Sequence, residues 1–426
     1  MLDYFMKLVT PTKKEQQGRA EVFTPIYKVN EMLDKLPEDV WTNPKLKFLD
    51  PANGIGNFPV CIFIKLMKSL KDYNNEEDGL DLRDEESRRK HILEEMIYVC
   101  ELDKKNCLLY NILLSHNGKY KLNIYQGSFF DININKVQDI WGFKQFDIIM
   151  SNPPYQERKT DNRKTKPLWN IFVKDSIKIL KENGYLLFIH PCGWRSGDGV
   201  FKEIFDLIME RNLIYLSTNN FDTGKKLFNV ATNFDIYCLQ NTFSNDNITI
   251  IEDDDNKLTE LNINNYKFIP SGCFDLYDII LARENDIRTE VLYSRSAYGT
   301  DKKNMSVNQN DEFKYPCSYT ITMKNGLKKW YSNEQKEHFG VSKVIWSNGL
   351  GTYPIIDKEG QYGLTQFSYA VVDEVSNLEN IKKAMNTEKF INMTKYVKFQ
   401  NNKYNYKIIR QLKKNFWELF IDLDNN

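Results

Sequence analysis

Short apolar runs alternate with longer segments of helical period between residues 21 and 245 of the 426-residue chain. This alternation is typical of a mostly parallel β-sheet whose strands are joined by crossover helices. The predicted strands lie at residues 47–49, 97–100, 123–125, 146–150, 185–189, 213–216 and 234–239. One crossover helix is predicted from apolar residues at helical spacing, namely Trp169, Phe172, Val173 and Leu180. Gly184 follows them as a predicted stop signal.

Two polar stretches interrupt this pattern. Residues 71–90 are densely charged and are predicted to form a solvated surface insertion. Asparagine and aspartate cluster again at 244–247 and 253–256, and the alternation of strands and helices is lost beyond them. We therefore expect three parts: an N-terminal arm over residues 1–20, an α/β domain over residues 21–245, and a smaller mixed α+β domain over residues 246–426.

Composition narrows the classes of function. The 58 basic residues equal the 58 acidic ones, so any contact with nucleic acid has to come from local basic patches. Seven scattered cysteines and four histidines show no metal-ligand spacing, so no metal site is predicted. No apolar run is long enough to span a membrane, and the first residues lack the pattern of a signal peptide. We expect a cytoplasmic protein that does not contact membranes.

A glycine turn and an acidic residue suggest a nucleotide-like ligand. Asp50 follows the first predicted strand, and Gly54 and Gly56 then allow the backbone to approach a ligand closely. Glu101 ends the second strand, where an acidic side chain in a doubly wound fold can bind ribose hydroxyls. No phosphate-binding loop of the Gly-x-x-x-x-Gly-Lys type occurs, which disfavours an ATPase. A turn without a ligand remains an alternative at this point.

The tetrad Asn152-Pro153-Pro154-Tyr155 carries the most specific chemistry. It follows the fourth predicted strand, which places it at the carboxyl edge of the sheet. The Asn152 side-chain oxygen and the Pro153 carbonyl can each accept one hydrogen of an exocyclic amine and so direct its lone pair at a methyl donor. A base in a duplex has to be flipped out to reach them, and stacking on Tyr155 and a second aromatic ring would offset that cost.

These residues, in this order, resemble the N6-adenine DNA methyltransferases of restriction-modification systems, in the gamma arrangement. The resemblance covers about residues 20–243. It implies a Rossmann-like domain that uses S-adenosyl-L-methionine, followed by a target recognition domain. It also implies that the enzyme transfers a methyl group to the N6 amino group of a flipped-out adenine in double-stranded DNA.

The resemblance assigns further roles to individual residues. Thr24, within Glu21-Val22-Phe23-Thr24-Pro25, is expected to touch the methionine part of the cofactor, and Phe129 its adenine ring. Ser128 stands where the family usually has aspartate. Phe228, within residues 227–232, is expected to stack on the target base, with Phe234 as the alternative. The expected cofactor contacts are Thr24, Asp50, Gly54, Gly56, Glu101, Ser128, Phe129 and Asn152.

Basic residues after the tetrad are predicted to form a mobile loop that clamps DNA. They are Arg158, Lys159, Arg163, Lys164 and Lys166. Further candidates lie nearer the C-terminus: the segments 346–349 and 352–354 for base edges, and Lys403, Lys407, Arg410, Lys413 and Lys414 for phosphates. Ordinary turns and a solvated basic helix face explain these C-terminal features equally well.

The tetrad leaves the substrate open. Enzymes that methylate protein glutamine, cytosine N4 or amines in RNA would use the same stereochemistry, and a catalytically inactive DNA-binding relative is a further alternative. The size of the part after residue 245 favours DNA over protein glutamine. About twenty residues precede the cofactor segment, too few for a nuclease domain, so the candidate partner is a separate restriction endonuclease. We also expect the protein to be a monomer.

Overall fold

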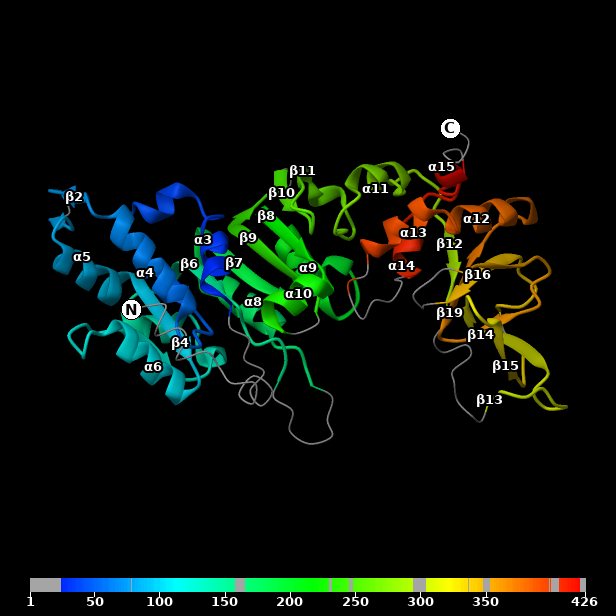
Figure 1. Ribbon diagram of the computed structural model, residues 1–426, viewed down its shortest axis with the longest axis horizontal. Coiled ribbons are helices and arrows are strands. Elements are labelled where there is room, and N and C mark those ends of the chain that lie inside the picture. The colour runs from blue at the N-terminus through cyan, green and yellow to red at the C-terminus, as the bar shows by residue number, and fades with distance from the viewer. Residues whose placement is uncertain are drawn as a thin grey trace. The chain divides into compact units, whose positions relative to one another are not determined.

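The protein is seen here in a computed structural model (Figure 1). It describes residues 24–421 except 78, 158–164, 230–231, 245–247, 294–303, 336, 348–352, 398 and 400–405. The chain divides into two compact units, residues 1–267 and residues 268–426, which are described separately. Within the described residues, no helix is both long and apolar enough to cross a membrane.

A nine-stranded sheet forms the centre of the first unit, in the order β11-β10-β8-β9-β7-β6-β1-β4-β5. β9 runs antiparallel to both of its neighbours and β11 antiparallel to β10, while the other pairs are parallel. All seven predicted strands are present. The strands are β1 (Phe48–Asp50), β4 (Ile97–Glu101), β5 (Asn123–Gln126), β6 (Phe146–Ser151), β7 (Leu180–Pro191), β8 (Arg211–Asn219), β9 (Phe234–Phe243), β10 (Ile248–Glu252) and β11 (Leu258–Asn262).

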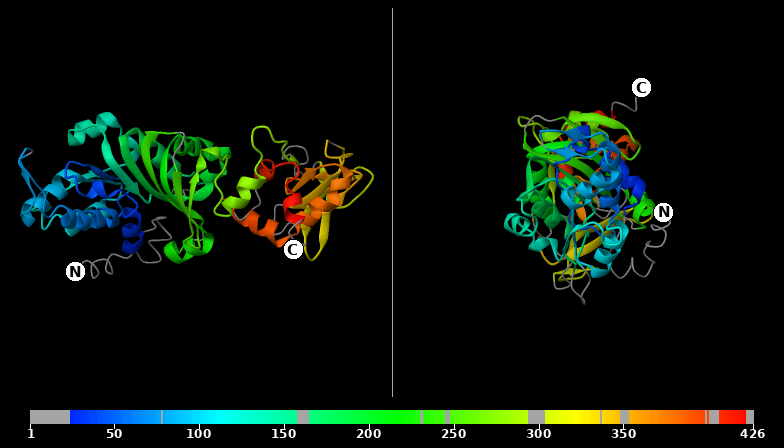
Figure 2. Two further views of the ribbon diagram at one scale, coloured as in Figure 1. Left: turned by 90° about the horizontal axis from the view of Figure 1, so that it is seen from above. Right: turned by 90° about the vertical axis from the view of Figure 1, so that its left-hand side faces the viewer.

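Helices cover both faces of this sheet (Figure 2). They are α3 (Ile26–Leu33), α4 (Asn57–Ser69), α5 (Glu85–His91), α6 (Lys104–Leu114), α7 (Ile134–Trp141), α8 (Trp169–Lys178), α9 (Lys202–Met209) and α10 (Phe221–Phe228). Shorter turns are η1 (Glu38–Trp41), η2 (Ile92–Met96), η3 (Phe129–Asp131), η4 (Cys192–Ser196), η5 (Gly199–Phe201) and η6 (Ile263–Asn265). Val29 of α3 and Phe228 of α10 share one buried cluster with Ile189 of β7. The next residue, His190, faces the opposite side and stacks on Trp169 of α8 at 4.2 Å.

The predicted crossover helix is shorter than expected. α8 ends at Lys178, and Leu180 instead begins β7, where it pairs with Phe146. Gly184 therefore lies inside a strand and does not stop the helix. A Cβ at Gly184 would lie 2.6 Å from the Asp147 carbonyl oxygen, so glycine allows β7 to pass close to β6 where their register shifts.

The boundary between the units lies after residue 267, not after residue 245 as expected. β10 continues the sheet beyond the polar stretch, with Ile250 paired to Tyr215 of β8. β11 then returns antiparallel to β10. The second polar cluster, residues 253–256, is the turn of this hairpin and not a linker between domains.

The charged insertion carries little secondary structure. Two-residue strands β2 (Asn74–Asn75) and β3 (Leu80–Asp81) pair with each other, and α5 follows. Most of its side chains are exposed, in agreement with the predicted surface insertion.

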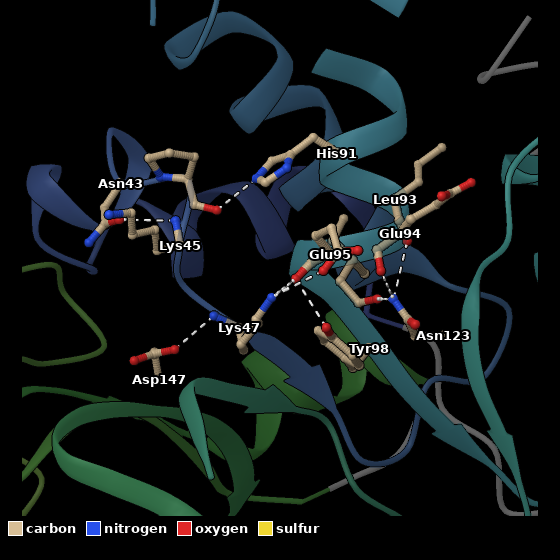
Figure 3. A network of polar contacts seen from close by, with 12 residues as sticks. Asn43, Lys45, Lys47, His91, Leu93, Glu94, Glu95, Tyr98, Asn123 and Asp147 are labelled. Carbon is tan, nitrogen blue, oxygen red and sulfur yellow. Dashed lines mark hydrogen bonds and ion pairs between the residues drawn. The ribbon is translucent and has the colours of Figure 1, made fainter. Parts of the chain in front are cut away.

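Polar contacts hold the amino-terminal edge of the sheet (Figure 3). The Lys47 backbone N–H donates to the Asp147 carboxylate at 2.8 Å, which joins the residue before β1 to the start of β6. The Lys47 ammonium donates to the Glu95 carbonyl before β4. At the start of β5, the Asn123 amide donates to the carbonyls of Glu94 at 2.8 Å and Ile97 at 3.1 Å. These bonds fix where the central strands begin, and thereby where they end.

The second unit contains two four-stranded sheets and several short helices. One sheet has the order β12-β19-β16-β17 and the other β13-β15-β14-β18. Its strands are β12 (Glu290–Leu292), β13 (Met305–Ser306), β14 (Tyr315–Thr322), β15 (Gly326–Ser332), β16 (Lys343–Ser347), β17 (Ile355–Asp357), β18 (Gly363–Leu364) and β19 (Ser368–Val372). Its helices are α11 (Phe274–Ile280), η7 (Val375–Asn377), α12 (Leu378–Met385), α13 (Glu388–Lys395), α14 (Tyr406–Ile409) and α15 (Glu418–Ile421). This is the mixed α+β composition expected for the C-terminal part.

Candidate active site at the carboxyl edge of the sheet

Three neighbouring parallel strands bring the predicted residues together. β4, β1 and β6 are adjacent in the sheet and end at Glu101, Asp50 and Ser151. Because parallel strands end at the same edge, these residues lie side by side with the tetrad that follows Ser151. The edge of the sheet predicted from sequence is therefore the edge at which the site forms.

The glycine turn is tied to the neighbouring strand β4. The Asn53 N–H donates to the Cys100 carbonyl at 3.0 Å, and the Gly54 N–H donates to Glu101 Oε2 at 2.7 Å. Gly56 has a φ of +99°, and a Cβ there would lie 2.6 Å from the ring of Tyr110. Only glycine fits this position without displacing the ring. The glycine at 56 therefore lets the turn pack closely against Tyr110 at the end of β1.

Glu101 holds a fixed orientation at this turn. Its second carboxylate oxygen, Oε1, accepts the Asp103 N–H at 2.7 Å. Both carboxylate oxygens are therefore oriented by backbone N–H groups at the position where the sequence predicts ribose binding.

Asp50 is a buried carboxyl group with 2% of its surface exposed. Burial raises its pKa to about 7, although hydrogen bonds from the Ala52 N–H and the Ser151 hydroxyl, at 3.0 and 3.1 Å, oppose that shift. The nearby Glu101 charge raises the pKa further. A carboxyl group in this condition gains its full charge when a cation is placed beside it.

The tetrad is joined to the beginning of the described chain. The Asn152 amide Nδ2 donates to Thr24 Oγ1 at 3.1 Å, and the Asn57 amide donates to the Thr24 carbonyl at 2.8 Å. Thr24 is buried, so these bonds form away from bulk water. Since the amide nitrogen of Asn152 is the donor in this pair, its oxygen is the acceptor end. Sequence reasoning gave Thr24 a cofactor contact and missed its link to Asn152.

The remainder of the tetrad presents an aromatic ring. Pro153 is buried and Tyr155 is half-buried. The Tyr155 hydroxyl is buried without a hydrogen-bond partner among the described residues. The Tyr155 carbonyl accepts the Leu168 N–H at 3.1 Å, which fixes the backbone just before α8.

Phe228, the predicted second stacking ring, lies at the end of α10 with 7% of its surface exposed. Its ring meets Phe234 edge-on at 5.1 Å. Phe234 is fully buried at the start of β9, which supports the view of it as a core residue. Val230 and Ala231 lie outside the described residues. The role of Phe228 toward a base stays a prediction.

The segment after β5 contains the predicted cofactor-adenine contacts. The Ser128 hydroxyl accepts the Phe130 N–H at 3.3 Å and caps η3. Phe129 is 3% exposed and stacks on Phe172 at 5.3 Å, whereas its neighbour Phe130 is 42% exposed. Leu102, directly after Glu101, is 64% exposed.

Leu102 and Phe130 are exposed apolar side chains near the predicted cofactor contacts, and the sequence analysis did not single them out. They follow the ends of β4 and β5, which are paired in parallel. For Leu102 the available signal was its position directly after Glu101 at the end of β4.

A buried ion pair lies at the same edge and was also missed. Arg195 Nε donates to Asp235 Oδ2 at 2.9 Å, with 1% and 0% of the side chains exposed. Asp235 sits in β9 opposite His190 of β7, so the pair ties the turn after β7 to the start of β9. Burial raises the pKa of Asp235 to about 6, and the Arg195 charge opposes the shift. This pair fixes the backbone beside Phe234.

The predicted DNA-clamping loop is only partly described. Arg158, Lys159, Arg163 and Lys164 lie outside the described residues. At the base of the loop, Gln156 and Pro167 form an isolated β-bridge, and the Glu157 N–H donates to the Lys166 carbonyl at 2.9 Å. Lys166 is exposed.

Several C-terminal candidates have other roles. Trp346 and Ser347 are buried within β16 and do not form a loop, because this strand is central in its sheet. Asn348, Gly349, Thr352 and Lys403 lie outside the described residues. Arg410 donates from Nε and Nη2 to the Val291 carbonyl at 3.2 and 2.7 Å, and Lys413 lies 3.9 Å from the Asp286 carboxylate. Tyr353 and Lys414 are exposed, Pro354 is buried and Lys407 is half-buried.

Known proteins resemble a large part of this chain. Residues 64–228 match the family model of the Eco57I restriction-modification methylases. An uncharacterized adenine-specific methylase of Mycoplasma pneumoniae is 26% identical, over 50% of this chain and 64% of that protein. A second match, to a type II restriction enzyme and methyltransferase of Methanocaldococcus jannaschii, is 36% identical over 19% of this chain and 8% of that protein.

The resemblance to restriction-modification adenine methylases is confirmed. The alignments span less than two thirds of the length of these curated relatives. Solved structures support the Rossmann-like α/β fold of such methylases. The type IIL restriction-modification enzyme MmeI, solved in complex with DNA, has a TM-score of 0.54 at 12% identity, over 94% of this chain and 69% of that one. The DNA-bound type ISP enzyme LlaBIII has a TM-score of 0.50 at 12% identity, over 87% and 35%.

Replacing Thr24 by valine removes the hydroxyl that accepts the Asn152 amide while keeping the side-chain shape. Loss of one such hydrogen bond, about 1 kcal/mol, lowers the rate of methyl transfer about fivefold if the bond orients Asn152. Single-turnover transfer measures this rate. Thr24→Ser is the matched control because it keeps the hydroxyl. Equal rates for Thr24→Val and the wild type would show that the bond has no positioning role.

Proposed function

We propose that this chain is a site-specific DNA methyltransferase that uses S-adenosyl-L-methionine to methylate the N6 amino group of a flipped-out adenine. The observation that carries the proposal is the Asn152–Thr24 hydrogen bond at the carboxyl edge of the sheet. In this pair the Asn152 amide nitrogen is the donor, which supports its amide oxygen as the acceptor for the substrate amine, next to the carbonyl of a buried proline. An amine held by two acceptors there directs its lone pair away from both.

The residues beside the tetrad fit the cofactor. The turn carries glycines at 54 and 56, and the amide oxygens of Asn53 and Asn57 beside them are buried without partners among the described residues. The Asp50 carboxylate would hold the cofactor's amino group and Glu101 its ribose hydroxyls. When bound, S-adenosyl-L-methionine supplies an electrophilic sulfonium methyl group. The chain's own residues would bind and orient the cofactor and the target base, and would exclude water at this edge.

The second unit is proposed as the target recognition domain. Its fold is separate from that of the first unit. This supports the role, because residues that recognise base sequence can then vary without changing the catalytic edge. Relatives named as restriction-modification enzymes favour DNA as the substrate. A cognate endonuclease carried by a separate chain, and a monomeric state, remain parts of the same proposal.

The direct test offers labelled S-adenosyl-L-methionine with mixed-sequence duplex DNA, RNA or bulk protein to the purified wild-type chain and to Asn152→Ala. We expect the wild type to place the label in N6-methyladenine of DNA. Removing the acceptor costs about 100-fold or more in transfer. Calorimetry checks that the variant still binds the cofactor. Label in RNA, protein or cytosine would replace adenine in DNA as the substrate, and no transfer at all would refute the enzyme.

Two substitutions of Tyr155 distinguish the contribution of its ring, by stacking, from that of its hydroxyl, by hydrogen bonding. Because its hydroxyl has no partner among the described residues, Tyr155→Phe should transfer methyl groups within a few-fold of the wild-type rate. Tyr155→Ala loses a stacking contact worth roughly 1–3 kcal/mol, and kcat/KM falls accordingly. Mismatching the target adenine lowers the cost of flipping, so this substrate should partly restore the alanine variant. A defect in Tyr155→Phe as large as that in Tyr155→Ala would contradict a stacking role.

The raised pKa of Asp50 predicts a pH dependence of cofactor binding. Below about pH 7 the buried carboxyl group is protonated and cannot balance the cofactor's positive amino group. Cofactor affinity should therefore rise with pH up to about 7 and level off above it. Calorimetry between pH 5.5 and 8.5 measures this change, and Asp50→Asn should bind weakly with a flat profile. A wild-type profile as flat as that of Asp50→Asn would exclude Asp50 as the titrating group.

A further inference from the structure

The outer part of the β14–β15 hairpin in the second unit is a two-stranded ribbon (Figure 1). β18 pairs with β14 only at Cys317 and Ser318, and β13 pairs with β15 only at Tyr331 and Ser332. Within the described chain, residues 320–328 therefore have no flanking strand on either side. Both of their outer edges are left unpaired by any strand of this sheet.

This hairpin is basic in a chain that has no net charge. Residues 315–332 contain Lys324, Lys328 and Lys329 and no aspartate or glutamate. Lys324 and Lys328 are exposed, and neither forms an ion pair with another described residue. By contrast, Lys413 and Lys414 line a hollow of about 500 Å³ together with acidic side chains that offset their charge. The hairpin is thus a local basic patch. A chain without net positive charge needs such a patch to contact nucleic acid.

One face of the ribbon is covered and the other is not. Ile321 and Leu327 pack against Ile345 of the other sheet in a buried cluster. Since side chains alternate along a strand, Thr320 and Lys328, which are paired across the ribbon, lie on the opposite face. Thr322 extends this face, and at the tip Met323 is 82% exposed beside exposed Lys324 and Asn325. Hydroxyl, amide and ammonium groups therefore lie together.

Stacked rings support the base of this face. Tyr319 and Trp330 lie parallel at 4.8 Å with 6° between their planes. The Lys328 ammonium is 5.5 Å from the centre of the Tyr319 ring. Cation–π attraction of this kind holds the lysine along the ribbon and not free in solvent. The polar face is consequently presented from a rigid platform.

We propose that this ribbon enters the major groove of the DNA duplex, with Lys324 and Lys328 on phosphates and Thr320, Thr322 and Asn325 at base edges. The major groove admits a two-stranded β-ribbon. The absence of acidic groups removes repulsion from the phosphates, and short hydroxyl and amide side chains suit hydrogen bonding to bases. The inference rests on the proposed function, since it assigns the surface that selects the methylation site.

The double variant Lys324→Gln/Lys328→Gln tests the phosphate contacts on the full chain with mixed-sequence duplex DNA. Two lost contacts should lower the slope of log Kd against log salt by roughly 1.8, because each phosphate contact contributes about 0.9. Cofactor affinity and kcat at saturating DNA should not change. Lys324→Arg/Lys328→Arg should keep the wild-type slope. A thermal melt verifies that each variant is folded.

Lys68→Gln/Lys71→Gln is the matched control for net charge. These lysines lie at and beyond the end of α4, toward the edge of the sheet opposite the tetrad. The control should leave the salt slope unchanged. If it lowers the slope as much as the ribbon variant does, only the overall charge matters and the proposed contacts are wrong. An unchanged slope in the ribbon variant overturns them as well.

Thr320→Val/Thr322→Val tests the base contacts. Sequencing of methylated adenines after expression in a host without methylation should reveal a relaxed or altered recognition sequence. The total rate of methyl transfer to DNA that contains many adenines should be retained. An identical recognition sequence would refute base reading by this face. A wild-type chain that methylates nothing would instead refute the proposed function, so the two failures are distinguishable.

Discussion

The site depends on hydrogen bonds that the carboxyl groups of Asp50 and Glu101 accept across strand boundaries. Asp50 of β1 binds the Ser151 hydroxyl of β6, and Glu101 of β4 binds the Gly54 N–H after β1. Three strands are thereby joined at their carboxyl ends as well as along their ladders. Because the Lys47 contacts fix the opposite ends, neither turn can shift along its strand. The tetrad inherits this rigidity from Ser151, its direct predecessor.

Two buried carboxyl groups lie at this edge, Asp50 and Asp235, and burial makes both costly to ionise. They differ in whether a cation lies beside them. Asp50 lacks a buried cation among the described residues and has a raised pKa, which fits the proposal that it binds the positive amino group of the cofactor. Asp235 is paired directly with Arg195, and that pair holds the backbone next to Phe234. A buried charge without its partner would be strongly destabilising, so we interpret Arg195 as a structural residue. Similar acidic residues at one edge thus have separate roles.

Patterns local in sequence predicted much of this architecture, and contacts distant in sequence did not follow from them. The strands were recognisable because buried β-strands are short apolar runs, and Asp50 and Glu101 because open α/β sheets bind ligands at the carboxyl ends of their strands. Leu180 was misassigned because an apolar residue suits either a helix or a strand. The boundary was placed too early because Asn and Asp favour hairpin turns as much as linkers. The bond between Thr24 and Asn152 spans 128 positions, which no local pattern encodes.

The neutral composition constrains how the chain can approach a polyanion. With 58 basic and 58 acidic residues, long-range steering is weak, and acidic side chains occupy the edge at which we propose that the cofactor binds. Attraction to the proposed DNA substrate must then act at short range, where salt screens it less and geometry matters more. A surface of this kind favours hydrogen bonds at fixed positions over diffuse charge. For the proposed adenine methylation, weak non-specific binding would favour selectivity, because few adenines outside the recognition site would be held long enough to flip.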